Sequence, residues 1–217
     1  MEHRGIKVRK EGSSFSTTGL SNYIGKELTV SRSKRSDEEY LKLLAYLIDY
    51  ICQPGVVIKP NQTIAYHSWS LKFVENGGNV YELWEAEQFG NDYCIGVDYS
   101  IIVVNQQLDE CYKQNASPIF PTFGQNIVVS KGVYEGLPVE AVRYPSPSHM
   151  CGWWLVTDEY DDDVKSLMNV HYYHVAFKRP DILKYLALPF AYRFVVDAYK
   201  FEAWFDEKIK NRHEDRK

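Results

Sequence analysis

An acidic run follows two adjacent tryptophans in the stretch SHMCGWWLVTDEYDDD, residues 148–163. Clustered carboxylates can bind calcium, act as the acid–base pair of a glycoside hydrolase, or form a negative surface that attracts a basic partner. A calcium loop of the EF-hand type needs a central glycine and a glutamate at its twelfth position, and DEYDDDVKSLMN has neither. The run therefore favours a solvated acidic loop, and a hydrolase that uses a carboxylate pair with His149 or His171 is the alternative.

Other residues with chemical potential do not form a recognisable site. Ser148 and His149 are adjacent, and adjacent side chains on an extended chain point apart, so they do not predict a catalytic dyad. His171 and His174 lie in VHYYHVAF, whose β-branched and aromatic residues predict a strand, where residues three apart face opposite sides. The sequence has no phosphate-binding glycine motif, no GxSxG and no CxxC. It therefore indicates no catalytic residue, no metal ligand and no cofactor.

The two tryptophans are expected to face opposite sides of one strand, because side chains alternate along an extended chain. One ring should then lie in the core and the other at the surface, while Gly152 allows a bulge or a close approach of another backbone. A surface aromatic beside carboxylates has the composition of an interface anchor with a charged rim. We therefore predict a partner-binding surface composed of Trp153, Trp154, Asp158, Glu159, Tyr160, Asp161, Asp162 and Asp163.

Periodicity outlines the elements that must position this surface. Ser36 and Glu39 form a capping box before a helix that ends at Pro54-Gly55, and residues 63–89 alternate around a turn at 76–79, as in a β-hairpin. Residues 93–106 read as a buried strand, 105–115 as a short helix, and 192–211 as a segment that ends helical. The layout indicates an α+β fold, a mainly antiparallel sheet with a few flanking helices.

The chain is expected to divide into three regions. Residues 1–25 read as a flexible basic arm, since residues 1–35 hold eight Lys and Arg but three acids. Residues 26–120 form an unassigned α+β region and residues 126–217 a C-terminal module. The boundary is expected near 115–126, unless the two regions pack as one domain.

Composition limits the classes of function. A net charge of -4 and a pI near 5.9 disfavour a nucleic-acid partner, which requires a basic surface. No stretch reaches the roughly 20 apolar residues of a membrane span, and MEHRGIKVRK lacks the apolar core of a signal peptide. Seventeen tyrosines suit sheet faces and protein interfaces. These features favour a cytoplasmic protein with reduced cysteines that binds another protein; they leave its oligomeric state open.

Residues 126–196 resemble the bacterial immunity protein thirty-three family, formerly a domain of unknown function. The shared features are the strand with Val129-Ser130-Lys131, the strand carrying Arg143, the pair Gly152-Trp153, the acidic Asp158-Glu159-Tyr160, and a P-x-I-x-x-Y-L helix followed by Pro189. The resemblance implies a cytoplasmic protein that protects its maker by binding a toxin of a polymorphic or contact-delivered system. It carries over no catalytic residue.

These observations lead to one main hypothesis and two alternatives. The main hypothesis is an immunity protein that occludes a cognate toxin by steric and electrostatic contact and has no enzymatic activity. The alternatives are the carboxylate-based hydrolase and a two-part binding protein whose N-terminal region has a ligand of its own.

Overall fold

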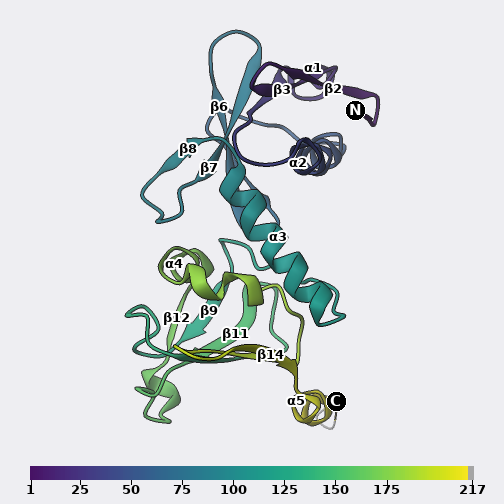
Figure 1. Ribbon diagram of the computed structural model, residues 1–217. Coiled ribbons are helices and arrows are strands. Elements are labelled where there is room, and N and C mark those ends of the chain that lie inside the picture. The colour runs from purple at the N-terminus through teal and green to yellow at the C-terminus, as the bar shows by residue number, and fades with distance from the viewer. Residues whose placement is uncertain (215–217) are drawn as a thin grey trace. The chain divides into compact units, whose positions relative to one another are not determined.

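The computed structural model describes residues 1–214 and divides into two compact units, Met1–Val103 and Val104–Lys217 (Figure 1). The division falls inside helix α3 (Asp98–Lys113), not in the proline-containing loop at 115–126 that the sequence indicated. That loop belongs to the C-terminal unit, where Ile119 N donates a hydrogen bond to Ala187 O at 2.8 Å.

The N-terminal unit has one eight-stranded sheet in the order β1-β2-β3-β4-β7-β6-β5, with β8 also paired to β7. Its β4 and β7 are parallel and the other pairs antiparallel. The strands are β1 (Glu2–His3), β2 (Ile6–Glu11), β3 (Ser14–Thr18), β4 (Glu27–Ser31), β5 (Thr63–Tyr66), β6 (Trp69–Glu75), β7 (Val80–Ala86) and β8 (Tyr93–Ile95).

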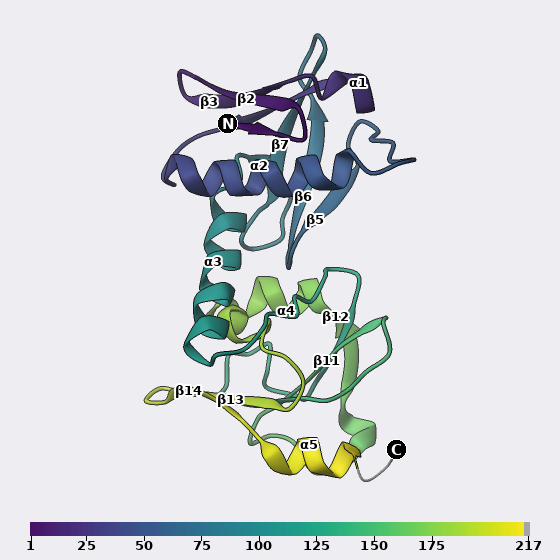
Figure 2. The same ribbon diagram turned by 90° about the vertical axis from the view of Figure 1, so that its right-hand side faces the viewer.

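Helix α2 (Asp37–Ile51) covers one face of this sheet (Figure 2). It begins at the predicted capping box, in which the Ser36 hydroxyl accepts a hydrogen bond from Glu39 N and the Glu39 carboxylate accepts one from Ser36 N. Its apolar face is buried from Tyr40 to Ile51, and the Tyr40 ring lies 6.0 Å from that of Phe15 on β3. The capping box and the helical period thus predicted this element correctly.

The N-terminal residues are not a loose arm. Residues 2–18 form β1, β2 and β3, and Ser21–Ile24 form the short helix α1. Ile6, Val8, Phe15 and Leu20 are buried. In this segment, basic residues alternate with apolar residues whose side chains point into the core. The prediction from composition overlooked this alternation and was therefore wrong.

The predicted hairpin is confirmed, but the following segment is mostly helical. Strands β6 and β7 join across Asn76-Gly77-Gly78-Asn79, and Trp69, Leu71 and Phe73 are buried. Of the strand expected over residues 93–106, only Tyr93–Ile95 is extended, and α3 begins at Asp98. Ile101, Val103 and Val104 of this run are buried on a helix, and an apolar run of this length does not distinguish a buried strand from a buried helix.

The C-terminal unit contains a six-stranded sheet in the order β12-β9-β11-β10-β13-β14. Because β9 and β11 are parallel, this sheet, like the first, is mixed, which corrects the expected mainly antiparallel arrangement within an α+β fold. The strands are β9 (Asn126–Val129), β10 (Val139–Arg143), β11 (Met150–Val156), β12 (Met168–His171), β13 (Tyr192–Val196) and β14 (Phe201–Phe205).

Short helices complete the C-terminal unit. They are the 3₁₀ helices η1 (Val164–Ser166) and η2 (Pro180–Tyr185) and the α-helices α4 (Tyr172–Lys178) and α5 (Glu207–Glu214). Tyr185 of η2 stacks on Phe194 of β13 with ring centres 4.9 Å apart, which places η2 against the core face of the sheet. Within residues 1–214, no helix is both long and apolar enough to cross a bilayer.

Candidate functional site

The two tryptophans of β11 lie on opposite faces of the sheet, as the strand pattern predicts. Trp153 has no exposed surface; its indole Nε1 donates to Leu186 O at 2.9 Å, and its ring lies 5.0 Å from that of Phe194. Trp154 is partly exposed and meets Tyr144 edge-on, with ring centres 5.8 Å apart. Trp153 therefore cannot offer surface to a partner, and only Trp154 of the pair stays in the candidate site.

Gly152 allows the strand to pass close to the preceding loop. Its φ is +84°, and a Cβ at this position would lie 2.4 Å from the carbonyl oxygen of Tyr144. The Tyr144 N–H donates to Gly152 O at 2.9 Å, and the register between β11 and β9 shifts between Met150 and Trp154. The close backbone approach, one of the two features expected of this glycine, is therefore present, and the strand pairing beside it is irregular.

Arg143 fixes the surroundings of Trp153 from the inside. Its side chain is buried, and the guanidinium donates to the carbonyl oxygens of Cys151 (2.8 Å), Ile119 (2.8 Å), Leu188 (2.6 Å) and Leu186 (3.4 Å). Burial lowers the pKa of Arg143, since the charged form loses hydration. The sequence placed Arg143 in a strand but did not reveal this role.

The five carboxylates of residues 158–163 are exposed, and Tyr160 is partly buried among them. Asp161 Oδ1 accepts hydrogen bonds from Ser166 Oγ (2.7 Å) and Asp163 N (3.1 Å), and the bond from Ser166 is the main reason that the pKa of Asp161 is lowered. Asp163 Oδ1 accepts from Lys165 N at 2.9 Å and so caps η1. Partial desolvation and the charges of Asp162 and its neighbours raise the pKa of Tyr160. The loop is thus ordered by its own hydrogen bonds while its charges face solvent.

A hydrogen-bonded latch holds the base of this acidic loop to the end of β9. Thr157 N donates to Ser130 Oγ at 3.0 Å, and Thr157 Oγ1 donates to Lys131 O at 2.6 Å. Lys131 Nζ also lies 3.1 Å from the Glu159 carboxylate. Two separate motifs of the sequence, Val129-Ser130-Lys131 and Asp158-Glu159-Tyr160, therefore meet at one point.

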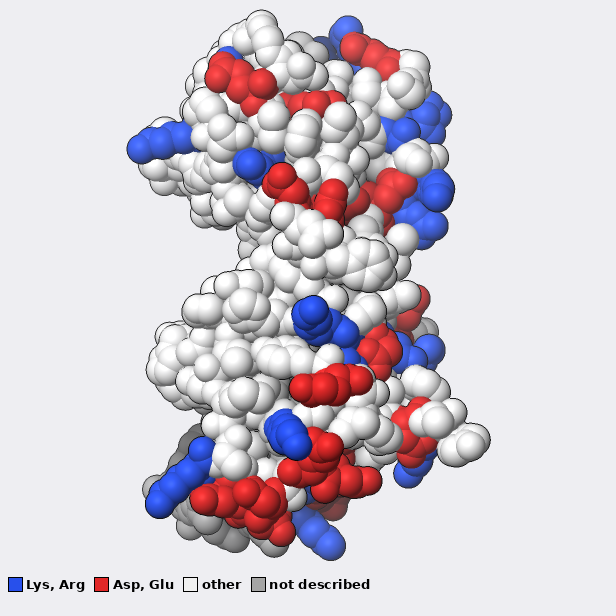
Figure 3. Space-filling model, turned by 90° about the vertical axis from the view of Figure 1, so that its left-hand side faces the viewer, with Lys and Arg blue, Asp and Glu red and all other residues white. Residues whose placement is uncertain are grey.

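Strand register places the acidic loop at a defined end of the sheet. Val156, the last residue of β11, pairs with Glu140 near the start of β10, and Glu140 also pairs with Val195 near the end of β13. The segments 130–138, 157–167 and 197–200 consequently leave the sheet at the same end. Figure 3 shows a face on which Asp and Glu side chains of the C-terminal unit gather in adjoining groups, with Lys and Arg between them.

The histidines of the predicted hydrolase lie toward the other end of the sheet. His149 precedes β11, and His171 at the end of β12 pairs with Asn126 at the start of β9. Strand β11 has seven residues, which at about 3.3 Å per residue separates His149 from the acidic loop by roughly 20 Å. The acidic carboxylates and His149 therefore do not converge on one reaction centre.

The segment VHYYHVAF is mostly helical, which corrects its prediction as a strand. Only Val170 and His171 belong to β12, and α4 begins at Tyr172. His171 and His174 are exposed, with ring centres 6.4 Å apart, and the Tyr173 ring lies 4.1 Å from that of His174. Among the described residues, no three His, Cys, Asp or Glu side chains gather as a metal site would require.

The fold and site together define an α+β unit that presents an ordered acidic loop and a surface tryptophan. The model of the Imm33-like domain family matches residues 106–206, slightly under half of the chain and nearly all of the C-terminal unit. The C-terminal portion of the chain therefore matches the Imm33-like family, as the resemblance over residues 126–196 predicted. No curated protein and no solved structure matches the chain.

Proposed function

We propose that this protein is an immunity protein that binds a cognate bacterial toxin and blocks it by occlusion, without catalysing a reaction. The Imm33-like domain supports the class, because immunity proteins act by binding. The observation that carries the proposal is the acidic loop, whose five carboxylates are exposed and whose backbone is ordered by Asp161 and Asp163. In this role the protein would act in the cytoplasm of the cell that makes the toxin.

The acidic loop would recognise a basic surface on the toxin, as expected of a toxin that acts on nucleic acid. Exposed charges mainly accelerate association and exclude partners of the same charge, while desolvated apolar contacts supply most of the affinity. Tyr160 within the loop and Trp154, near the end of the strand that leads into it, are aromatic residues with accessible surface. An already ordered loop loses little conformational entropy on binding, which favours a tight complex.

The geometry offers less support to a hydrolase. A general acid needs a raised pKa, which proteins achieve by burying the carboxyl group. The carboxylates of the loop are exposed, and hydrogen bonding lowers the pKa of Asp161. A glycosidase also holds two carboxyl groups across a cleft, whereas this loop projects its charges into solvent.

The test compares toxin binding by the wild-type protein and a neutral-loop variant, with the toxin-like protein encoded beside its gene as the ligand. The variant carries Asp158→Asn, Glu159→Gln, Asp161→Asn, Asp162→Asn and Asp163→Asn, in which the amide oxygens can still accept the loop's hydrogen bonds. We expect its association rate at low salt to fall about tenfold or more, with a weaker dependence on salt. Surface plasmon resonance at several ionic strengths measures both quantities.

A matched control separates the loop from net charge. It neutralises five exposed acids of the N-terminal unit instead, Glu2, Glu11, Glu38, Glu75 and Asp92. The control should associate like the wild type apart from a small general charge effect. Equal losses in both variants, or unchanged binding by the neutral-loop variant, would remove the acidic loop from the proposal.

A further inference from the structure

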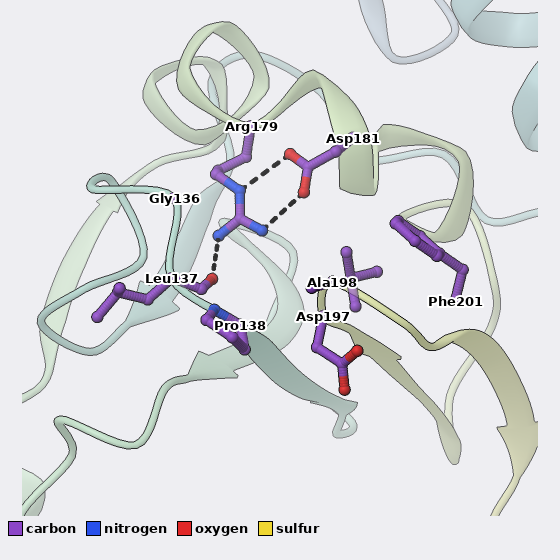
Figure 4. A pocket seen from close by; sticks show the side chains of 9 residues that line it. Gly136, Leu137, Pro138, Arg179, Asp181, Asp197, Ala198 and Phe201 are labelled. Atoms are coloured by element: carbon purple, nitrogen blue, oxygen red, sulfur yellow. Dashed lines mark hydrogen bonds and ion pairs between the residues drawn. The ribbon is translucent and has the colours of Figure 1, made fainter.

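A pocket of about 310 Å³ opens in the C-terminal unit beside η2 and the turn between β13 and β14 (Figure 4). This volume is at the lower end of the roughly 300–1,000 Å³ typical of ligand pockets, so it suits one side chain better than a cofactor. The pocket lies outside the surface proposed above. Its lining comprises Gly136, Leu137, Pro138, Arg179, Asp181, Val196, Asp197, Ala198 and Phe201.

One side of the pocket is a neutral ion pair. Arg179 is buried, and its Nε and Nη2 donate to the two carboxylate oxygens of Asp181 at 2.9 and 2.7 Å. Its Nη1 donates to Val133 O (3.1 Å) and Leu137 O (3.0 Å). Since a guanidinium has five N–H groups, these four bonds leave little capacity to bind an anion. The pair therefore shapes the pocket more than it attracts a charged ligand.

The remaining walls are mostly apolar. Leu137, Pro138, Val196, Ala198 and Phe201 supply them, and 56% of Phe201 is exposed. Figure 4 shows Phe201 and Pro138 on opposite sides of the space beside the ion pair, with the Asp197 carboxylate turned away from the pair. Lys184 Nζ already lies 5.7 Å from the centre of the Phe201 ring, which disfavours a second cation against this wall. The lining thus matches an apolar side chain.

The pocket is at the same end of the sheet as the acidic loop. Val139, which follows the pocket residue Pro138, pairs with Val196, and its neighbour Glu140 pairs with Val156 at the base of that loop. The Asp181 carboxylate is neutralised by Arg179, so Asp197 and the acidic loop supply the negative charge at this end of the sheet. A segment that approaches this end of the sheet therefore meets an apolar socket beside Asp197, at the end of the sheet that also carries the acidic loop.

We propose that the pocket binds an aromatic or branched aliphatic side chain of a protein partner, in a segment where Lys or Arg flanks that side chain. The partner's identity as a toxin rests on the proposed function, but the chemistry of the socket does not. The pocket supplies the apolar anchor that Trp153, fixed in the core, cannot provide. An apolar anchor within a charged rim is the usual anatomy of a protein interface.

Three tripeptides test the pocket by NMR titration of the ¹⁵N-labelled full-length protein: acetyl-Lys-Phe-Lys-amide, acetyl-Lys-Ala-Lys-amide and acetyl-Glu-Phe-Glu-amide. The first should shift the amide signals of Gly136, Leu137 and residues 196–201 and bind about tenfold more tightly than the alanine peptide, because its ring is buried. The glutamate-flanked peptide should bind more weakly than the lysine-flanked one. Equal affinity of the phenylalanine and alanine peptides, or shifts confined to other residues, would overturn the proposal.

Filling the pocket provides the matching variant. Ala198→Phe places a ring at the pocket without changing charge and should abolish the preference for phenylalanine over alanine. Ala65→Phe, at an exposed alanine of β5 in the N-terminal unit, is the control and should keep that preference. An unchanged preference in Ala198→Phe would contradict the assignment. The peptide titration does not use the toxin, so its result is independent of the toxin-binding test. The pocket assignment can be correct even if the neutral-loop variant binds toxin normally. It can also be wrong even if that variant supports the proposed function.

Discussion

Individual residues of β11 show what alternation along a strand predicts and what it leaves open. The two-residue period of a strand placed Trp153 and Trp154 on opposite faces, but the local sequence does not show which face packs against the core. That choice depends on partners distant in sequence, such as Phe194 and the carbonyl of Leu186. The acidic residues were easier to place, since five neighbouring carboxylates repel one another and remain solvated unless they are paired. Their exposure followed from composition alone.

The conformation of Gly152 leads to a prediction about the stability of the fold. Gly152→Ala would force an L-side chain into φ +84° and set its Cβ 2.4 Å from Tyr144 O, so the backbone must move. We expect a loss of at least about 2 kcal/mol in the free energy of unfolding, measured by urea titration. Gly136→Ala is the control: φ is +82° there, but no atom lies within 4 Å of the added Cβ, so only about 1–2 kcal/mol should be lost. Equal losses would show that the close approach is unimportant.

At the scale of elements, the strongest local signals predicted correctly and the ambiguous ones did not. The capping box of Ser36 and Glu39 and the Gly-rich turn at 76–79 determine local geometry by themselves, and both elements formed as expected. The apolar run Ile101–Val104 fits either a buried strand or a buried helix, and the tertiary structure made it helical. The resemblance found the motifs of the C-terminal unit, but their meeting at the latch required the fold.

The latch between β9 and the acidic loop carries an element-scale prediction. In Ser130→Ala, the buried Thr157 N–H loses its acceptor, which costs about 1–3 kcal/mol and loosens the base of the loop. Amides of residues 157–166 should then exchange hydrogen for deuterium faster, as measured by mass spectrometry. Ser146→Ala, which removes a hydroxyl that donates to Met150 O in another loop, should leave this exchange unchanged. Identical exchange in Ser130→Ala and the wild type would show that the loop orders itself without the latch.

At the scale of the whole molecule, the division into two units was only partly predictable. The resemblance suggested a C-terminal module that begins at residue 126, whereas the division into two units lies inside a helix where no Pro or Gly marks it. The basic residues near the N-terminus suggested mobility, whereas alternating apolar side chains seat that segment in the first sheet. Local composition indicates how well a segment is solvated. Whether the segment packs into a core depends on which distant strand pairs with it.

Acid stability of the whole chain depends on carboxylates whose pKa values shift in opposite directions. Burial opposes ionisation of Glu27, but hydrogen bonds from Ser21, from Thr17 Oγ1 (2.7 Å) and from Gly19 N (2.9 Å) outweigh it and lower the pKa of Glu27. Its ionised form therefore stabilises the folded state above the unfolded value of about 4.3, and that contribution is lost as the pH falls through the folded pKa. Glu85 behaves oppositely: burial raises its pKa, so its contribution is present below the unfolded value and is lost as the pH rises through the folded pKa.

Two substitutions in the N-terminal unit separate these effects. Relative to the wild type, Glu27→Gln should be less stable at neutral pH, and the difference should shrink as the pH falls below about 4, because the wild-type carboxyl is then protonated as well. Relative to the same reference, Glu85→Gln should show the opposite slope, gaining on the wild type as the pH rises from about 4 toward neutrality. Urea unfolding at successive pH values between about 2.5 and 7 measures both differences. If the stability difference from the wild type changed with pH in the same direction for both variants, the hydrogen bonds to Glu27 would not outweigh its burial. The acid sensitivity of this unit would then have to arise from its surface ion pairs.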